Sequence, residues 1–395
     1  MTYLNVSIGG GLLELRGEQK ATLRQGFGIG RRWGWVVAGL MMVPCLACSE
    51  TPSRGDVTAE GHVADLRPQG DVLGGEVGVA DLHADDGASD TQRDDAPSIV
   101  HDCKNPDPAW LLCDDFEGLA QGIDGWFSVS GWTETIGKGD AGRLTSTKDA
   151  HRGAYALFMP AAASAGYQGA DVMWRACSGE NKPGCKTLLG YSQLYFRVFV
   201  KLAADHVKVH HFLNIGGGPV DDYWAPYGNA GCRPNGARSM GTTVDFKKTT
   251  HETFFYTYSP DMKCDPGATC AKYADPQKIC DDCAKKGMPC SNGLECCWGN
   301  SYAPTPAVAL PLGKWFCFEM MMKQNDIGKA NGEMAYWIDG KLAKKVQTMA
   351  WRKDAKLQLN KVRLQHYLTT SDAGGHSNRV SFDDVVISTK RVGCQ

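Results

Sequence analysis

Two adjacent histidines, His210 and His211, stand in the alternating apolar run "VKVHHFLNIGGGP" at residues 207–219. Such a pair could bind a transition metal, act as an acid and a base, or simply pack within a strand. Successive side chains of a β-strand point to opposite faces, so a strand here would place His211 on the apolar face with Val209 and Leu213. We therefore expect His211 to be a core histidine and His210 to be the one available for acid/base chemistry. The divergence of the two rings argues against a two-histidine metal site.

Two other runs alternate in the same way and carry aromatic and cationic side chains on one face. In "YSQLYFRVFV" (191–200) the apolar set is Leu194, Phe196, Val198 and Val200, and the opposite set is Tyr191, Gln193, Tyr195, Arg197 and Phe199. In "NKVRLQHYL" (360–368) the apolar set is Val362, Leu364 and His366, and the opposite set is Lys361, Arg363, Gln365 and Tyr367. Aromatic rings stack on sugars while polar groups bond to hydroxyls and carboxylates. We expect these faces to line one shared saccharide groove.

The rest of the chain indicates the fold that must position these residues. Short alternating runs separated by Gly, Pro, Asn and Asp dominate, and no sustained helical period is present, which is typical of an all-β protein. The clearest hairpin joins "EMAYWI" to "KLAKKV" through Asp339 and Gly340, residue types that accept positive φ in a tight turn. About a dozen such runs predict a two-sheet β-sandwich or jelly roll in one domain, residues 101–395.

The charge of this domain restricts its partners. Residues 101–395 hold 34 Lys and Arg against 30 Asp and Glu, a mildly basic balance without dense basic clusters. That balance is compatible with an anionic ligand and argues against nucleic-acid binding. We expect a monomer with a polysaccharide partner, and its charge is compatible with an acidic one.

The N-terminal 48 residues resemble a bacterial lipoprotein signal. Arg31 and Arg32 precede an apolar run at residues 33–47, which is shorter than the roughly 20 residues that span a bilayer. The ending "CLAC" resembles a lipobox with Cys48 as the lipidated thiol, although Cys45 stands where Leu is preferred, so release after cleavage is the alternative. Residues 49–100 carry 12 acidic residues against three arginines, which predicts an acidic, disordered tether. These features predict a lipoprotein of the bacterial cell envelope, anchored to the outer membrane and facing the periplasm or the exterior.

The chain has 16 cysteines, a number typical of a secreted or periplasmic protein with disulfides. Seven of them lie from Cys264 to Cys297, inside an insertion that we place at residues 260–298. Zinc at Cys280 and Cys283 is the alternative, but this CxxC has no matched second pair. We expect a disulfide-stapled loop beside the binding face.

Seven further cysteines remain outside the insertion once Cys45 and Cys48 are set aside. Because each group has an odd number of cysteines, complete pairing requires at least one disulfide between the insertion and the sandwich. Proximity in sequence suggests two of the other pairs, Cys103 with Cys113 and Cys177 with Cys185.

The chain resembles a bacterial branch of the concanavalin A-like jelly rolls in the segments "CDDFEG", "LYFRVFVKL", "LGKWFCFEMMMKQN", "NGEMAYWIDGKL" and "VSFDDVVISTKRVGC". This branch is related to glucuronan lyase and to the fungal cellulose-induced protein of the same fold, within the polysaccharide lyases. The resemblance covers most of residues 113–394 apart from the insertion. Its motifs are mainly fold-forming, so they indicate the architecture more than the activity.

A lyase of that group would cut a uronic acid polymer by β-elimination, which needs a group to neutralise the carboxylate, a base and an acid. The candidates for neutralisation are Arg197, Arg363 and Gln365. The base would be His210 or a tyrosine, and the acid would be Tyr195, Tyr256 or Tyr367. The same residues would serve a noncatalytic carbohydrate-binding module, or a structural surface protein that binds no sugar. Paired carboxylates of a glycosidase are not evident, so hydrolysis ranks below elimination.

The resemblance also implies a calcium ion that ties the first strand to the last. The matching acids are Asp115 and Glu117 in "DDFEG" and Asp383 and Asp384 in "SFDDV", with backbone carbonyls near residues 151–153. We expect this Ca²⁺ to be structural. The alternative is that these acids only bound strand ends.

Overall fold

The computed structural model describes residues 102–136, 144–160, 170–179, 182–264, 276–288, 290, 297–368 and 378–394. The expected signal peptide with Cys48 and the expected tether at residues 49–100 lie outside the described residues, so they stay predictions. Across the described ranges, no helix is both long and apolar enough to cross a membrane.

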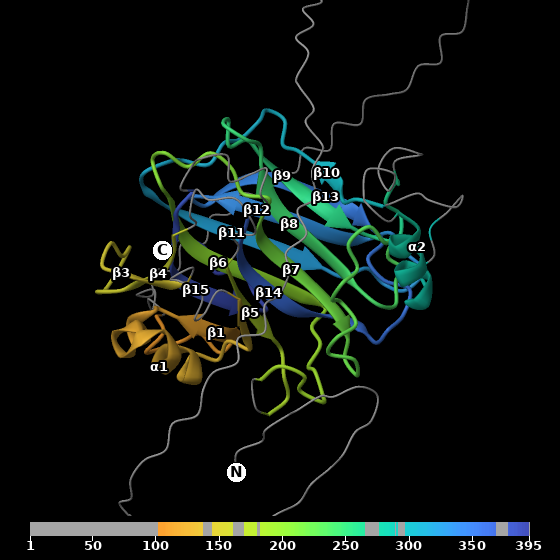
Figure 1. Ribbon diagram of the computed structural model, residues 1–395, viewed down its shortest axis with the longest axis horizontal. Helices are drawn as coiled ribbons and strands as arrows, with labels where there is room; N and C mark the ends of the chain where they lie inside the picture. Colours follow the sequence, from red (N-terminus) through yellow and green to blue (C-terminus); the bar gives the residue numbers. More distant parts are fainter. Residues whose placement is uncertain are drawn as a thin grey trace, which may run out of the picture. The chain divides into compact units, whose positions relative to one another are not determined.

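The eight-stranded antiparallel sheet forms one layer of the fold (Figure 1). Its strands are, in order, β13 (Lys341–Met349), β12 (Gly332–Ile338), β11 (Trp315–Lys323), β6 (Gln193–Leu202), β15 (Val380–Ser388), β4 (Ala156–Met159) and β3 (Thr145–Thr147). The eighth strand, β1 (Trp110–Asp114), pairs with β15. The first and last strands of the described chain therefore lie together, as the resemblance implied.

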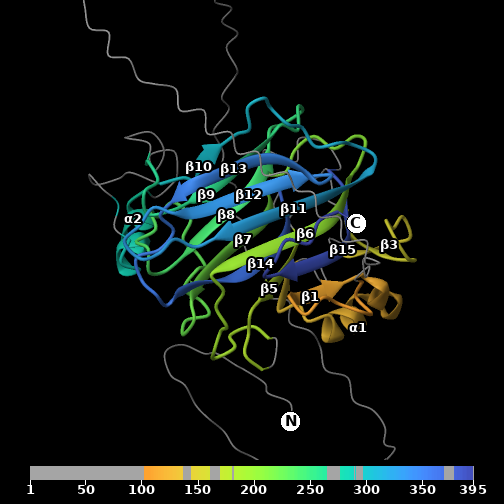
Figure 2. The ribbon, with the colours of Figure 1, turned by 180° about the vertical axis from the view of Figure 1, so that it is seen from behind.

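The seven-stranded antiparallel sheet forms the second layer, and Figure 2 shows both layers from behind. Its strands are, in order, β10 (Asn300–Tyr302), β9 (Thr253–Tyr258), β8 (Met240–Phe246), β7 (His211–Pro219), β14 (Leu357–Tyr367), β5 (Ala170–Arg175) and β2 (Glu134–Ile136). The predicted two-sheet jelly roll is confirmed. In the part of the chain that the structure describes, three short helices accompany it, namely η1 (Glu117–Gln121), α1 (Gly122–Val129) and α2 (Pro276–Lys285).

The apolar core lies between the two sheets. On β6 the side chains of Leu194, Phe196, Val198 and Val200 are fully buried, and on β14 those of Val362, Leu364 and His366 are. Strand alternation predicted both sets. The Tyr336 hydroxyl of β12 donates a hydrogen bond to Thr253 Oγ1 of β9 at 2.8 Å, which links the layers through a buried polar pair. Each large apolar side chain buried here contributes about 1.5–3 kcal/mol.

The hairpin between β12 and β13 turns at the predicted residues. Asp339 has φ 49° and Gly340 has φ 75°, both in the left-handed region that a two-residue turn of this type requires. Ile338 and Lys341 pair directly on either side of the turn. The hairpin prediction is confirmed.

Six disulfides join cysteines of the described residues. The predicted pairs Cys103–Cys113 and Cys177–Cys185 are both present. The remaining four are Cys232–Cys283, Cys264–Cys297, Cys280–Cys290 and Cys317–Cys394. The bond from Cys232 to Cys283 ties the insertion to the sandwich, as complete pairing required. Because Cys280 and Cys283 each bond to another cysteine, the zinc alternative is wrong.

Candidate functional site

The residues expected to share one groove lie on opposite outer faces of the sandwich. Tyr195 and Arg197 belong to β6 in the eight-stranded sheet, whereas Arg363, Gln365 and Tyr367 belong to β14 in the seven-stranded sheet. Alternation directs each polar set away from the common core, so the two sets point in opposite directions. The expectation of a single shared groove is therefore wrong.

The outer face of the seven-stranded sheet collects the larger set of polar and aromatic groups. We call it the polar face. Its central side chains come from four neighbouring strands: His211 and Asn214 of β7, Thr243 and Asp245 of β8, Tyr256 and Tyr258 of β9, and Lys361, Arg363, Gln365 and Tyr367 of β14. None of them belongs to the apolar core cluster of the described residues.

His211 lies on this polar face and not in the core. Phe212 and Leu213 are consecutive and both fully buried in the core, so the simple alternation breaks between them. Asp245 stabilises the irregularity, because its Oδ1 accepts the Phe212 backbone N–H at 2.9 Å while its Oδ2 lies 2.9 Å from His211 Nδ1. The prediction of a core His211 is wrong for this local reason.

His210 immediately precedes β7 and is exposed on the same side. Its ring centroid lies 4.5 Å from that of His211 and 5.2 Å from that of Tyr367, edge to face. The two histidine rings therefore lie together, and the prediction that they diverge is wrong. His210 does contact one of the predicted residues, Tyr367.

The aromatic rings continue across the sheet toward β9. The Tyr256 ring lies 5.2 Å from that of His211, and the Tyr258 ring lies 5.6 Å from that of Tyr256. Directly opposite Tyr256 and Tyr258, β8 carries the small residues Thr243 and Gly241. The result is a continuous row of rings from β14 to β9, a surface suited to stacking on sugars.

Lys361 is the most perturbed cation of the polar face. Burial, followed by the nearby positive charges of Arg363 and Arg175, lowers the pKa of Lys361 to about 7. In the sheet Lys361 pairs with Gly216 of β7 on one side and with Arg175 of β5 on the other, so strands flank it on both sides. A large fraction of this lysine is therefore a neutral amine at neutral pH.

The cations next to Lys361 are held by hydrogen bonds. Arg363 forms an ion pair with the buried carboxylate of Asp171 on β5. Arg175 is fully buried; it donates to the Tyr223 carbonyl oxygen at 2.8 Å and to Asn360 Oδ1 at 3.3 Å. These contacts fix the guanidinium groups beside the lysine and maintain the positive field there.

A cavity of about 190 Å³ opens on the polar face. Its lining includes His211, Asn214, Tyr258 and Lys361 from the sheet, together with residues of the segment between β7 and β8. Cys232 of that segment is disulfide-bonded to Cys283 of α2, and Asn235 Nδ2 donates to the Gly287 carbonyl oxygen at 3.2 Å. The insertion therefore supports one wall of this cavity.

The outer face of the eight-stranded sheet is covered near Tyr195. The Tyr195 and Trp337 rings are 6.4 Å apart, and the Arg391 guanidinium lies 4.5 Å above the Trp337 ring. Glu319, fully buried, accepts the Val392 backbone N–H at 2.8 Å. The C-terminal segment, tethered by the Cys317–Cys394 disulfide, thus occupies this face.

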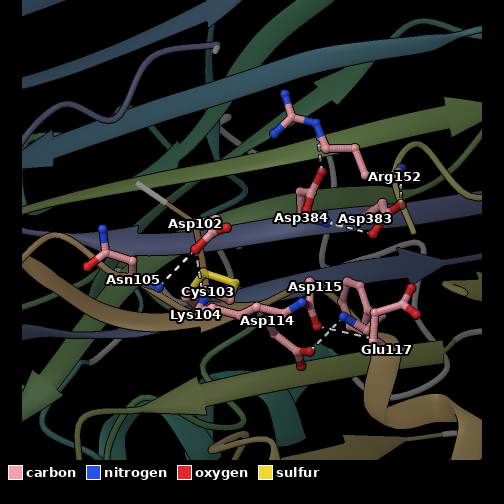
Figure 3. Close-up of a disulfide and its surroundings, with 12 residues drawn as sticks. Asp102, Cys103, Lys104, Asn105, Asp114, Asp115, Glu117, Arg152, Asp383 and Asp384 are labelled. Carbon is pink, nitrogen blue, oxygen red and sulfur yellow. Dashed lines mark hydrogen bonds and ion pairs between the residues drawn. A yellow bond between two sulfur atoms is a disulfide. The ribbon is translucent and has the colours of Figure 1, made fainter. Parts of the chain in front are cut away.

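The four acids expected to bind calcium mostly accept hydrogen bonds from the backbone (Figure 3). Glu117 Oε1 accepts the N–H groups of Ala154 and Tyr155 at 2.7 and 2.9 Å. Asp383 Oδ2 accepts those of His151 and Arg152 at 2.7 and 3.1 Å. These bonds connect the strand ends, and burial raises the pKa of Asp383 to about 7.

The remaining two acids have other contacts. Asp384 Oδ2 lies 3.2 Å from His151 Nδ1, and Asp115 Oδ1 accepts the Glu117 backbone N–H at 3.2 Å. Across the described ranges, no group of three His, Cys, Asp or Glu side chains is arranged to hold a metal ion. The structure holds no metal ion that would test the calcium site, so calcium stays a prediction.

Comparison with solved structures finds matches of low identity, with TM-scores below 0.5, that include polysaccharide lyases. The PL-14 alginate lyase from Aplysia kurodai superposes with a TM-score of 0.46 at 13% identity, over 71% of this chain and 99% of that one. The endo-β-1,4-glucuronan lyase from Trichoderma reesei gives 0.40 at 15% identity, over 66% and 92%. The cellulose-induced protein Cip1 gives 0.39 at 18% identity, over 72% and 100%.

The chain resembles these lyases and Cip1. At such identities and TM-scores the likeness says nothing of activity or substrate, and the fold assignment rests on the two sheets themselves. No family model and no curated protein matches the sequence.

Sequence reasoning missed several members of the polar face as functional candidates, among them Lys361, Asn214, Tyr258 and the supposedly buried His211. Alternation along "NKVRLQHYL" had already placed Lys361 beside Arg363, so a signal for this lysine was present. Asn214 and Tyr258 lie on strands whose order in the sheet the sequence does not reveal. The structure keeps His210, Tyr256, Arg363, Gln365 and Tyr367 on this face and separates Tyr195 and Arg197 from them.

Proposed function

We propose that the protein binds an acidic polysaccharide along the polar face and cleaves it by β-elimination. The observation that carries this proposal is Lys361, a lysine with a pKa lowered to about 7 that lines a cavity together with His211 and Tyr258. A neutral amine beside an arginine and a phenol is the combination of groups that elimination next to a carboxylate requires.

Each group has a role in the proposed reaction. Arg363, held by Asp171, neutralises the uronate carboxylate and makes the α-proton acidic enough to remove. Lys361 takes the C5 proton, the electron pair forms the C4–C5 double bond, and the C4–O bond breaks. Tyr258 donates its hydroxyl proton to the leaving oxygen. The products are a new hydroxyl end and an unsaturated uronate end.

His211 serves substrate binding in this scheme. A carboxylate only accepts hydrogen bonds, so His211 Nδ1 donates to Asp245 Oδ2, and in the neutral ring Nε2 is then an acceptor. An acceptor beside the cavity suits a sugar hydroxyl. His210, Tyr256, Gln365 and Tyr367 extend the same face and provide stacking and hydrogen bonds to neighbouring sugar units.

The test is incubation of the domain with alginate, glucuronan, polygalacturonate and a neutral glucan such as cellulose. We expect ultraviolet absorbance from unsaturated ends with at least one of the three acidic polymers and none with cellulose. Retention of an acidic polymer without any rise in absorbance would leave a carbohydrate-binding module. Failure to retain any of the four polymers would overturn the proposal.

We further propose that the domain is a monomeric lipoprotein of the bacterial envelope, anchored to the outer membrane through Cys48. Six disulfides among the described residues support an oxidising compartment. Expression with a radiolabelled fatty acid tests the anchor. We expect label in the wild type and none in Cys48→Ala, whereas equal labelling of both would exclude this site.

A further inference from the structure

Two glycines lie side by side on neighbouring strands of the polar face. Gly241 of β8 pairs with Gly216 of β7. Tyr258 pairs with Gly241 from the β9 side, and Lys361 pairs with Gly216 from the β14 side. Neighbouring strands are about 4.8 Å apart, so the two glycines leave a gap in the side chains between the tyrosine and the lysine. We call this gap the glycine slot. Gly241, Tyr258 and Lys361 all line the cavity of about 190 Å³.

The two glycines of the slot are there for different reasons. A Cβ atom on Gly216 would lie 2.6 Å from the Met240 carbonyl oxygen, so strand packing alone requires a glycine at that position. A Cβ atom on Gly241 would lie 3.3 Å from the Ile215 carbonyl oxygen and 3.5 Å from Gly216 Cα, contacts that a small shift relieves. A glycine inside a strand often marks a place where a ligand approaches the backbone closely. Gly241 fits that description.

Two amide oxygens of the cavity residues have no hydrogen-bond partner among the described residues. They are Oδ1 of Asn214 and Oδ1 of Asn229, and both atoms are buried. Asn214 Nδ2 donates to the Thr242 carbonyl oxygen at 2.9 Å, and Asn229 Nδ2 donates to Ser239 Oγ at 3.1 Å. These bonds fix both amide groups with their nitrogens engaged. A buried acceptor without a donor is unfavourable, so this cavity calls for an N–H or O–H group.

The remaining wall of the cavity supplies an apolar surface and a donor. Pro226, Ala230 and Pro234 of the segment between β7 and β8 line it, and no Asp, Glu or Arg is among the described residues of the lining. Ser239 Oγ accepts the bond from Asn229, so the Ser239 hydroxyl keeps its own proton to donate. One small space therefore contains an acceptor, a donor and an apolar patch. An acetamido group carries the complementary parts, namely an N–H, a carbonyl oxygen and a methyl group.

We propose that the glycine slot binds the acetamido group of an N-acetylated amino sugar. The amide N–H donates to Asn214 Oδ1, the Ser239 hydroxyl donates to the acetyl oxygen, and the methyl group packs against Pro226 and Pro234. The inference rests on the proposed function, which places a polysaccharide on this face, and it adds an amino sugar next to the uronate. The uronate carboxylate stays with Arg363.

The first test is calorimetric titration of the full-length chain with three methyl glycosides: that of N-acetylglucosamine, that of glucose, and that of 2-O-acetylglucose. We expect the N-acetylglucosamine glycoside to bind about tenfold tighter than the glucose glycoside, because it adds a hydrogen bond and a buried methyl group. The acetyl ester should bind with intermediate affinity, because it has the methyl and carbonyl groups without the N–H. Equal affinity for all three sugars would overturn the proposal.

Two variants locate the binding in the slot. Gly241→Ala places a methyl group on its floor, and Ser239→Ala removes the donor. Each should weaken binding of the N-acetylglucosamine glycoside at least several-fold. Ser128→Ala, on an exposed position of α1, is the matched control and should bind as the wild type does. Ser239→Ala keeps the test valid if Gly241→Ala fails to fold. Wild-type affinity in every folded slot variant would overturn the proposal.

A second test separates the slot from the proposed cleavage. Hyaluronan and glucuronan contain the same uronate, but only hyaluronan also contains N-acetylglucosamine. We expect KM for elimination to be at least tenfold lower with hyaluronan. Elimination from glucuronan without any preference for the acetamido sugar would overturn the slot and leave the proposed function intact. Selective binding of the acetamido sugar without elimination from either polymer would support the slot and count against the cleavage.

Discussion

The two outer faces of the sandwich carry similar residue types and differ in what covers them. On the eight-stranded sheet, Glu319 and Trp337 are contacted by the C-terminal segment that the Cys317–Cys394 disulfide holds in place. On the seven-stranded sheet, Tyr258 and Lys361 line an open cavity. Alternation sorts side chains into inner and outer sets on both sheets. Which outer set can meet a ligand depends on where the rest of the chain packs.

The largest expected difference between the faces concerns catalysis. Lys361→Ala removes the proposed base, so kcat on the acidic polymer should fall by about 10²–10⁴-fold. Lys341→Ala, at the exposed first residue of β13, is the matched control and should retain wild-type kcat. Initial rates of absorbance increase give both values. His211→Gln should lower kcat less than Lys361→Ala does. A larger loss of kcat in His211→Gln would identify His211 as the base.

The pH profile gives a second measure of the polar face. Because the base must be neutral and the pKa of Lys361 is lowered to about 7, activity should be lost as pH falls through 7, about tenfold per unit. The measurement is kcat/KM between pH 5 and 9 at constant ionic strength, with circular dichroism confirming that the fold persists. A profile that is flat from pH 6 to 8 would remove Lys361 from this role.

Two disulfides compare the faces directly. Cys232–Cys283 supports the cavity wall of the polar face, whereas Cys317–Cys394 closes the other face. Replacing either pair by serines should lower the free energy of unfolding by about 2–4 kcal/mol. Only the first replacement should also raise KM for the polymer several-fold. Similar KM values in both variants would show that the insertion does not shape the binding face.

The core between the faces contributes a pH dependence of its own. His206 and His366 have ring centroids 5.7 Å apart, and their ring nitrogens are buried without partners among the described residues. The pKa of His206 is lowered to about 2 and that of His366 to about 3, and burial is the main cause of both shifts. Both pKa values in the folded state lie below the value near 6.5 in the unfolded state. The two histidines therefore contribute to stability above pH 6.5, and this contribution is lost as pH falls.

His366→Leu isolates this contribution from those of the acids. Below pH 6.5 the difference in unfolding free energy between wild type and variant should shift in favour of the variant by about 1.4 kcal/mol per pH unit. Urea unfolding at pH 6.5, 5.5 and 4.5 measures it. A difference that does not change with pH would show that His366 is not held neutral.

The smallest effect is expected for calcium. Because backbone N–H groups already bond to Glu117 and Asp383, adding a chelator should change the melting temperature by less than about 1 °C. Thermal unfolding with EDTA and with excess calcium tests this. A rise of several degrees with calcium would support the predicted structural ion.

Much of the fold followed from local pattern. The β6 and β14 core sets, the Asp339–Gly340 turn and two disulfides between near neighbours were predictable, because each depends on residues close in sequence. Helix α2 and the short strands β2, β3 and β10 were not predicted. Each of the three strands is only three residues long, too short to show a period.

The candidate site was predictable only in part. The sequence by itself determined which side chains leave the core, since the two-residue period of a strand is a local property. Only the tertiary structure decided that β6 and β14 lie in different sheets, that Asp245 turns His211 outward, and that the C-terminal segment covers one face. Those outcomes depend on contacts between residues far apart in the chain, and strand alternation contains no information about such partners.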